Sequence, residues 1–351
     1  MNDSHRPIIW KNHELFLLDQ RILPHKEEFI PVRNIDDCIQ AIKDMVVRGA
    51  PCIGFTAIYG IALWVKQLTD LTVESARKAA DAMIGARPTA VNLSYEANRC
   101  YEIIRIALKD GKSKEQIYDQ LVEHGSCQIE ESEEKNTVMA EIGIAELKKK
   151  YPSKKWNLMT HCNTGFLACG SLGTALGVIS LAHRKGHVEH VYADETRPYL
   201  QGSRLTAFEL GKENIPYSIV VEGAASYLLS HGKVDAIFVG ADRIAANGDT
   251  ANKVGTATLA IVAHHYRIPF YVVAPVSSFD ITLAHGKEIE IEMREMNEIT
   301  EFRGQRIAPV GAISVNPSFD VTDHQLITGI ICERGLINPA VKGDLVRVVK
   351  S

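Results

Sequence analysis

The chain has 351 residues, of which 46% are hydrophobic and 23% are charged, and its formal net charge is −4. This composition is typical of a globular protein with room for two domains. The small net charge makes nucleic acid and anionic membranes poor partners, and no stretch reaches the roughly 18 apolar residues of a membrane span. The seven cysteines are scattered, without a CxxC pair. That pattern favours a reducing, cytoplasmic setting and argues against a disulfide framework or a structural zinc site.

The first 150 residues predict a small sheet followed by helices. Three short apolar runs within residues 7–32, separated by prolines, indicate an antiparallel meander. Asn34 then predicts the N-cap of a helix through Val47, with two aspartates in its first turn. Further helices are expected over 52–68, from Thr72, from Asn92 and over 113–150. The charges of this last, long helix are typical of a solvated face.

From Tyr151 onward, apolar strands alternate with helices. Strands are predicted at 156–160, 188–193, 217–221, 234–239 and 269–274. Helices are predicted at 173–185, 202–213, 223–231 and 253–267. This alternation indicates an α/β fold with a parallel sheet and right-handed crossovers. We expect a small-sheet and helical domain at 1–150, which includes the long helix, and a Rossmann-like catalytic domain at 151–351, whose tail from Asn338 packs back or crosses to another subunit.

The stretch Trp156–Gly177 has the pattern of a strand, a polar turn and a glycine-rich lead into a helix. Ligands of doubly wound folds bind outside the carboxyl ends of the strands, and Cys162 falls at such an end. A thiol at a helix N-terminus, among backbone N–H groups, has its pKa lowered into a working range. Cys162 is therefore a candidate for nucleophilic or acid-base chemistry; the alternative is a small residue packed in a crowded turn.

Two other interpretations of this stretch are weaker. Its glycines do not form GxGxxG at any register, which disfavours a dinucleotide site with Glu195 as the ribose-binding acid. His161, Cys162 and Cys169 lack the spacing of metal ligands. We expect neither a cofactor nor a metal.

A second strand, DAIFVG, ends just before Asp242. Near the apolar core of the sheet, desolvation would raise the carboxyl pKa and make Asp242 a usable acid or base. The alternative is an N-cap or an ion pair with Arg243. Asn252 and Lys253 precede a helix expected to begin near Val254, where a lysine and amide donors make an anion site.

Three further turns also suit an anion. The polar segment 195–204 uses Gln201-Gly202-Ser203 to open a helix. Arg48-Gly49-Ala50-Pro51 and Arg87-Pro88-Thr89 each set an arginine beside helix-start donors, as in a phosphate clamp. Each turn alone is typical of a surface. Around one cysteine and one aspartate, they predict a phosphorylated small-molecule substrate and a thiol–carboxyl pair for proton transfer.

Seven motifs in one order, spread over residues 8–337, resemble the 5-methylthioribose-1-phosphate isomerase family. They are RGAPCIG, RPTAVNL, THCNTG, ETRPYLQGSRLTAFEL, VGADRIAANGDTANKVGT, APVSSFD and NPSFDVTDHQLITGII. The resemblance implies an aldose–ketose isomerase that needs no cofactor, a homodimer, a small N-terminal domain and a Rossmann-like C-terminal domain. It also implies Cys162 and Asp242 as the catalytic pair. The implied substrate and phosphate positions are Arg48, Gly49, Ala50, Arg87, Gln201, Asn252 and Lys253.

Some positions depart from the family pattern. Glu222 stands where aspartate is usual, Glu290 and Met293 alter the IPIEER-like stretch, Ala257-Thr258 replace an aromatic-small pair, and Asp323 replaces a proline. These departures concern the pocket for the 5-substituent. They leave two sugars open, 5-methylthioribose 1-phosphate and 5-deoxyribose 1-phosphate.

Other functions of the same fold stay as alternatives. One is isomerisation of ribose 1,5-bisphosphate. Another is a non-catalytic, nucleotide-sensing scaffold subunit, like the regulatory subunits of the guanine-nucleotide exchange factor for translation initiation. Those subunits lack the cysteine–aspartate pair that this chain has, which favours the enzyme. A dinucleotide-dependent oxidoreductase is the third alternative, and it requires binding of NAD.

Overall fold

The computed structural model describes residues 6–350 except 89, 171, 303 and 342. The chain divides into two compact units. The first comprises Met1–Glu134 and Gly165–Gly173, and the second comprises Lys135–Thr164 and Thr174–Ser351. The predicted boundary at 151–153 marks the end of the long helix α5 (Lys114–Lys150), whereas the two units divide within that helix.

The first unit starts with the predicted antiparallel meander. Its three strands are β1 (Ile8–Lys11), β2 (Glu14–Leu18) and β3 (Phe29–Val32), with β2 in the middle. Leu15 and Leu17 of β2 are fully buried, because alternate side chains of a strand point to the same face. They pack into one hydrophobic core with the helices that follow.

The helices of the first unit are α1 (Ile35–Lys43), α2 (Ala50–Gln67), α3 (Val73–Ile84), α4 (Val91–Lys109), the start of α5, and α6 (Phe166–Cys169). Helix α2 is buried on nearly every side, as expected of a helix that is apolar all round. The predicted N-cap at Asn34 is confirmed, and the helix predicted from Thr72 has this residue as its N-cap. Helix α1 ends at Lys43, earlier than predicted, because the chain turns through a left-handed Met45.

The second unit is built on a seven-stranded sheet in the order β16-β15-β10-β7-β4-β5-β6. Its strands are β4 (Trp156–Thr160), β5 (Val188–Asp194), β6 (Tyr217–Val220), β7 (Ala236–Val239), β10 (Phe270–Val273), β15 (Gly329–Cys332) and β16 (Gly335–Ile337). The neighbouring strands are parallel except for β15 and β16. This sheet and the small antiparallel sheet confirm the predicted fold class.

The order of the strands reverses at β4. The chain runs outward from β4 to β5 and β6 on one side, and then returns to β7, which pairs with the other side of β4. At such a reversal the connections diverge to opposite faces of the sheet, which leaves a crevice outside the carboxyl ends of the two strands. The fold therefore provides a ligand position beyond β4 and β7.

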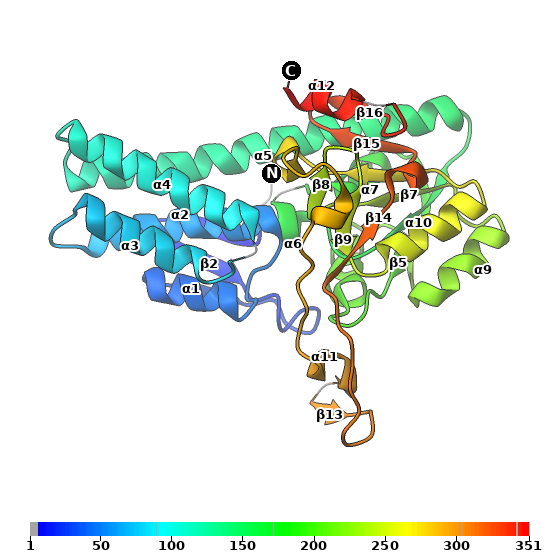
Figure 1. Cartoon of the computed structure of the whole chain (residues 1–351), viewed down its shortest axis with the longest axis horizontal. Coiled ribbons are helices and arrows are strands. Elements are labelled where there is room, and N and C mark those ends of the chain that lie inside the picture. Colours follow the sequence, from blue (N-terminus) through cyan, green and yellow to red (C-terminus); the bar gives the residue numbers. More distant parts are fainter. Residues whose placement is uncertain (1–5, 89, 171, 303, 342, 351) are drawn as a thin grey trace. The chain divides into compact units, whose positions relative to one another are not determined.

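The helices of the second unit are α7 (Ala175–Arg184), α8 (Ala207–Lys212), α9 (Ala225–Ser230), α10 (Thr256–His265) and α12 (Asp344–Lys350), besides the second part of α5 (Figure 1). The predicted helix from 253 begins only at Thr256, because the residues before it form a strand. The C-terminal tail packs back on its own unit, since Leu345 is buried and Arg334 donates to the carbonyl of Val348.

A second, four-stranded sheet was not predicted. It has the order β11-β8-β9-β14 and contains β8 (Arg243–Ala245), β9 (Thr250–Lys253), β11 (Phe279–Asp280) and β14 (Phe319–Thr322). These strands are only two to four residues long, too short to show a period of two in the sequence. They matter because β9 carries the predicted site residues Asn252 and Lys253.

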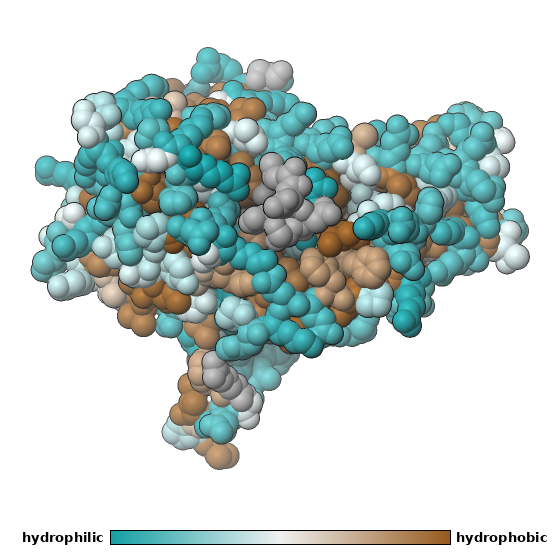
Figure 2. Space-filling view, turned by 180° about the vertical axis from the view of Figure 1, so that it is seen from behind, coloured by the Kyte–Doolittle hydropathy of each residue, from teal (hydrophilic) through white to brown (hydrophobic). Residues whose placement is uncertain are grey.

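Residues 291–317 form an arm that projects from the rest of the second unit (Figure 1). It contains α11 (Asn297–Thr300) and a hairpin of β12 (Glu301–Phe302) and β13 (Gln305–Arg306). Large apolar side chains on the arm are exposed, Val310 by 94% and Ile313 by 85%, and Figure 2 shows hydrophobic surface there. Across the described ranges, no helix is both long and apolar enough to cross a membrane.

Candidate active site

Cys162 lies two residues beyond the end of β4 and is buried. Its backbone is left-handed, with φ 63°, a conformation that costs a non-glycine residue roughly 1–2 kcal/mol. Two threonines hold this backbone: the N–H of Cys162 donates to Thr196 Oγ1 at 2.9 Å, and Thr206 Oγ1 donates to its carbonyl at 2.6 Å. Strained residues that the surroundings fix in this way are concentrated at functional sites.

The thiol is not at the start of a helix, which corrects one of our expectations. The next helix, α6, has Gly165 as its N-cap and is a single turn, and α7 begins only at Ala175. The helix-dipole argument for a lowered thiol pKa therefore does not apply to Cys162. Its backbone is instead fixed by the threonines of the neighbouring strand and helix.

The segment after β5 is also strained. Thr196 and Leu200 are left-handed, at φ 62° and 59°, and a β-branched residue adopts this conformation rarely. A Cβ on Gly202 would lie 1.6 Å from the carbonyl oxygen of Asp194, so only glycine fits there. Gln201 is buried, and its Oε1 has no hydrogen-bond partner within the described part of the chain. An orphaned polar atom of this kind is costly unless a ligand satisfies it.

Gly202 opens a helical turn as predicted, although the turn at Gly202–Thr206 is π-helical and runs directly into α8. Single π-helical turns are frequent at functional sites. Here the turn positions Thr206 so that its Oγ1 donates to the Cys162 carbonyl. The predicted site residue Gln201 is thus part of the same loop that holds the cysteine.

His161 and Asp194 form a buried pair that our sequence reasoning missed. His161 Nδ1 lies 3.0 Å from Asp194 Oδ2, and its Nε2 lies 3.0 Å from the carbonyl oxygen of Val254. Burial raises the pKa of Asp194. Burial opposes the charge on His161, but the hydrogen bond and charge of Asp194, with the Val254 carbonyl, outweigh it and raise the pKa of His161. Both groups therefore keep a proton to higher pH than they do in water.

Asp242 follows β7, and its backbone N–H donates to the carbonyl of Ala251 at 2.9 Å. Its side chain is exposed, so the expectation of a carboxyl desolvated in the apolar core is wrong. The reason is that β7 ends at Val239 and the chain passes at once into β8 of the four-stranded sheet. Asp242 nevertheless lies beyond the carboxyl end of the strand that pairs with β4, at the same sheet edge as Cys162.

Asn252 and Lys253 lie on β9 and not at the start of a helix, which corrects another expectation. Asn252 is buried and donates to Thr256 Oγ1 at 3.0 Å. Lys253 Nζ donates to the Ser318 carbonyl at 2.7 Å and lies 4.6 Å from the ring centroid of Phe319. Both side chains are fixed by the strand and by its neighbours.

The amide donors at the start of α10 already have an anion. Asp320 accepts from the N–H of Gly255 at 2.7 Å and from the N–H of Ala257 at 3.0 Å. The predicted anion site at this helix N-terminus is therefore filled by a carboxylate of the chain itself. A substrate phosphate would depend on Lys253 and on neighbouring side chains instead.

The remaining predicted residues belong to the first unit. Helix α2 begins at Ala50, and Gly49 is its N-cap with φ 91°. A Cβ on Gly49 would lie 2.4 Å from the carbonyl oxygen of Ala168 in α6, so this position requires glycine. Arg48 and Arg87 are half-buried. Thr89, also named in the predicted clamp, lies outside the described residues.

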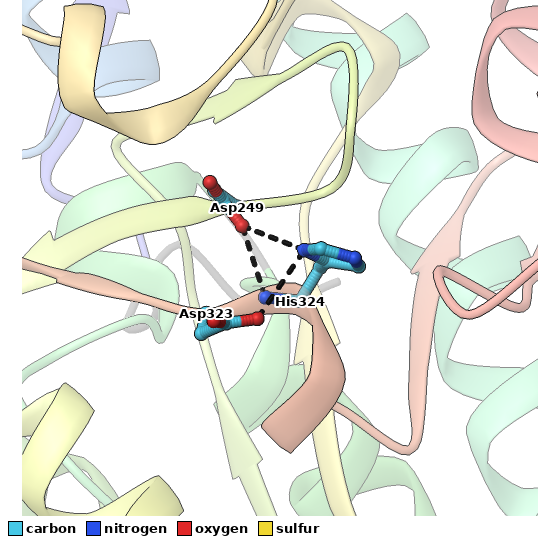
Figure 3. Close-up of side chains that lie close together, drawn as sticks. All are labelled: Asp249, Asp323 and His324. Carbon is cyan, nitrogen blue, oxygen red and sulfur yellow. Dashed lines mark hydrogen bonds and ion pairs between the residues drawn. The ribbon is translucent and has the colours of Figure 1, made fainter. Parts of the chain in front are cut away.

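One cluster has the composition of a metal site. Asp249, Asp323 and His324 offer ligand atoms within 4.8 Å of one another (Figure 3). Asp249 Oδ1 accepts from the backbone N–H and faces Nδ1 of His324, and its Oδ2 accepts from Gly286 N–H. Asp323 Oδ1 caps the N–H of Gln325. These bonds tie three loops together, which is the role that the geometry supports.

Comparison with known proteins agrees with this arrangement. The sequence model of the Initiation factor 2 subunit family matches residues 46–339. A methylthioribose-1-phosphate isomerase of Thermoanaerobacter sp. (strain X514) is 45% identical, over 98% of this chain and 99% of the relative. The chain belongs to the methylthioribose-1-phosphate isomerase family. The prediction of an isomerase agrees with the names of such relatives.

Solved structures extend the likeness to the whole fold. The 5-methylthioribose 1-phosphate isomerase from Pyrococcus horikoshii OT3 aligns with a TM-score of 0.90 and 38% identity, over 98% of this chain and 96% of that one. The structure of a translation initiation factor eIF-2B, subunit delta, from A. fulgidus aligns with a TM-score of 0.87 and 38% identity, over 99% of both chains. Proteins named for catalysis and for translation thus share this fold.

Proposed function

We propose that the protein is an aldose–ketose isomerase that converts 5-methylthioribose 1-phosphate into the corresponding ribulose 1-phosphate. The observation that carries the proposal is the reversal of strand order at β4. It brings Cys162, after β4, and Asp242, after β7, to one sheet edge, in a chain whose relatives are named for this reaction.

The chemistry requires an acid and a group that moves a proton. The anomeric oxygen carries phosphate, so the ring cannot open as a free hemiacetal does. We propose that Asp242 protonates the ring oxygen as the bond from C1 to that oxygen breaks. Cys162, as the thiolate, then takes the proton from C2 to form the enol. The proton returns from Cys162 to C1 while the Asp242 carboxylate takes the proton of the C2 hydroxyl, which gives the ketose and restores both groups. Asp242 is exposed in the structure, and the bound sugar would supply the desolvation that favours its acid form.

A direct shift of hydride from C2 to C1 is the other route to the same product. It requires Cys162 or Asp242 only for protons on oxygen, in a site from which water is excluded. Reaction in deuterium oxide separates the two routes. Deuterium at C1 of the product supports the enol route, because a proton held on Cys162 exchanges with solvent before it is returned, whereas the hydride route leaves C1 with the hydrogen that began on C2.

We propose that the substrate phosphate is held by the positions that the family resemblance implies. These are Arg48, Gly49, Ala50, Arg87, Gln201, Asn252 and Lys253. The support differs among them. Among the described residues, Gln201 Oε1 is buried without a hydrogen-bond partner, and Lys253 is held by Ser318 and Phe319. Asn252 is held by Thr256. The arginines and the Gly49 turn are positioned by the start of α2 and the end of α3.

The preferred 5-substituent is a separate question. Glu222, one of the departures from the family pattern, accepts from the backbone N–H of Arg197 at 2.5 Å and so shapes the loop that carries Gln201. Because Glu222 and the other departures from the family pattern are sequence differences of this chain, 5-deoxyribose 1-phosphate stays as the second candidate substrate. Loss of a thiomethyl contact changes binding by only about 1–3 kcal/mol, so one enzyme can accept both sugars.

Phosphorus and proton NMR of the purified protein with each sugar phosphate tests the proposal. The three arms are 5-methylthioribose 1-phosphate, 5-deoxyribose 1-phosphate and ribose 1,5-bisphosphate. Formation of a 1-phosphoketose supports the isomerase, and the ratio of kcat/KM values identifies the preferred sugar. If none of the three is converted, the proposal fails, and a stable complex with a nucleotide or another protein would then support the scaffold alternative.

A further inference from the structure

We propose that His161 is a positioning residue, which fixes the Cys162 turn to the turn that follows Lys253; this inference rests on the proposed isomerase function. The ring is fully buried, and both of its nitrogens are engaged. One bond runs to Asp194 at the end of β5, and the other runs to the Val254 carbonyl. His161 thus joins three segments that carry predicted site residues.

The two hydrogen bonds determine where the protons are. A carbonyl oxygen only accepts, so Nε2 must carry hydrogen toward Val254. A second proton then lies between Nδ1 and Asp194 Oδ2, on one or the other atom. The pair has no net charge in either case, so its complete burial avoids the large desolvation cost of an unpaired charge. The bridge is complete only while this shared proton is present.

The neighbouring backbone is shaped around the ring. A Cβ on Gly255, whose φ is 104°, would lie 2.8 Å from His161 Cε1, so the turn after Lys253 approaches the ring closely. On the Asp194 side, Thr196 Oγ1 donates to the Asp194 carbonyl and accepts from Cys162 N–H. The same short network therefore connects the ring, the cysteine backbone and the turn at Val254.

A histidine in the core that only stabilises the fold is the competing explanation. Two substitutions of this residue separate the explanations. His161→Gln can present its amide N–H near the position of Nε2 and retain the bond to Val254. His161→Asn is shorter, so it can reach Asp194 but not Val254. If His161 positions the turn at Val254, the glutamine variant should retain most of the kcat that the asparagine variant loses. If His161 is only structural, both variants should lose stability equally, with no selective effect on kcat.

The experiment compares the two variants with the unsubstituted protein in the NMR assay, after thermal melts have established that each is folded. We expect His161→Asn to lower kcat by about 100-fold with KM changed less than about threefold, and His161→Gln to remain within about tenfold of the unsubstituted protein. Equal kcat losses in both variants, or full kcat in folded His161→Asn, would overturn the inference. An inactive unsubstituted protein would instead refute the proposed function.

A second measurement needs no substrate. The rate of alkylation of Cys162 by iodoacetamide, followed by mass spectrometry, reports how firmly its turn is held. We expect His161→Asn to raise that rate about tenfold or more, as about 1.4 kcal/mol of local stability is lost, with no change at exposed Cys127. An unchanged Cys162 rate would overturn the inference even if no sugar were turned over.

Discussion

At the scale of single residues, the cysteine and the aspartate at the strand ends carry the proposed chemistry. Cys162→Ser and Asp242→Asn should each lower kcat by about 10²–10⁴-fold, the usual contribution of a positioned acid or base. Progress curves with the preferred sugar phosphate measure the loss. Cys127→Ser and Asp70→Asn, at exposed positions, are the matched controls and should retain activity. Full activity of either site variant would refute its assigned role.

The His161–Asp194 pair predicts how activity depends on pH. The groups that face His161 are Asp194, Glu222 and, through its charge, Asp320. The pKa of His161 is raised above 6.5 and that of Asp194 above 3.8. The stabilisation from the shared proton is therefore complete below pH 6.5 and is lost as pH rises through the raised pKa of the folded pair.

We expect kcat to fall at high pH for this reason. After loss of the proton, the Asp194 carboxylate and the lone pair of His161 Nδ1 repel each other. In Asp194→Asn an amide N–H replaces the shared proton, so the fall assigned to the pair should disappear. A pH profile of kcat for both proteins is the measurement, and identical alkaline limbs would contradict the assignment.

At the scale of elements, the contact between α2 and α6 depends on one glycine. Gly49→Ala would place a Cβ 2.4 Å from the Ala168 carbonyl oxygen at a φ of 91°. We expect a loss of about 2–4 kcal/mol in the free energy of unfolding, from the left-handed backbone and from overpacking. Gly111→Ala is the control, because φ there is also positive but nothing lies within 4 Å. Equal losses in urea unfolding would show that the close approach is unimportant.

The three loops joined by Asp249 make a second prediction at this scale. Burial opposes its charge, but bonds from Asn247, Gly286 and His324 outweigh burial and lower the pKa of Asp249 below 3.8. Its contribution to stability is thus present above pH 3.8 and is lost as pH falls through the lowered pKa. Asp249→Asn should cost about 1–3 kcal/mol at pH 7.

Urea unfolding from pH 7 down to pH 3 measures this contribution. The difference between Asp249→Asn and the unsubstituted protein should shrink at the acid end. Asp323→Asn is a suitable control, because asparagine caps a helix about as well as aspartate. A constant difference across the pH range would contradict the prediction.

The sequence predicted long elements and strand ends better than it predicted short ones. Strand β4 and helix α5 were found within one residue because each has a long or strongly apolar pattern. Strands β8, β9 and β14 were missed because they are short and contain polar residues, whereas β7 and β10, equally short, are continuous apolar runs. That omission caused two errors, the expected burial of Asp242 and the placing of Lys253 at a helix start.

The bonds around Cys162 could not be predicted for a different reason. Thr196, Thr206 and Asp194 are distant from it in sequence and meet it only through the strand order and the π-helical turn. The sequence identified Cys162 as a candidate only through its position at the end of β4. The hydrogen-bond partners depend on backbone conformations that a single sequence does not reveal, such as the left-handed Thr196.

At the scale of the whole molecule, we propose a homodimer. The family resemblance implies it, and the exposed apolar side chains of the arm are suited to burial against another surface. Light scattering coupled to gel filtration should give twice the chain mass of 38.8 kDa at micromolar concentration. A mass of one chain over the whole concentration range would refute the proposal.

The path of the chain at residues 165–173 has a consequence for inheritance. This segment follows the Cys162 turn but is part of the first unit, where the Leu167 carbonyl accepts from Gln20 and the Cys169 carbonyl accepts from Ser132. The coding sequence of the first unit is therefore interrupted by that of the second. A recombination event that exchanged residues 1–134 as one block would leave 165–173 unchanged, and this segment would then have to pack against the residues of a different protein. We expect the two units to have diverged together in ancestry and not as exchangeable modules.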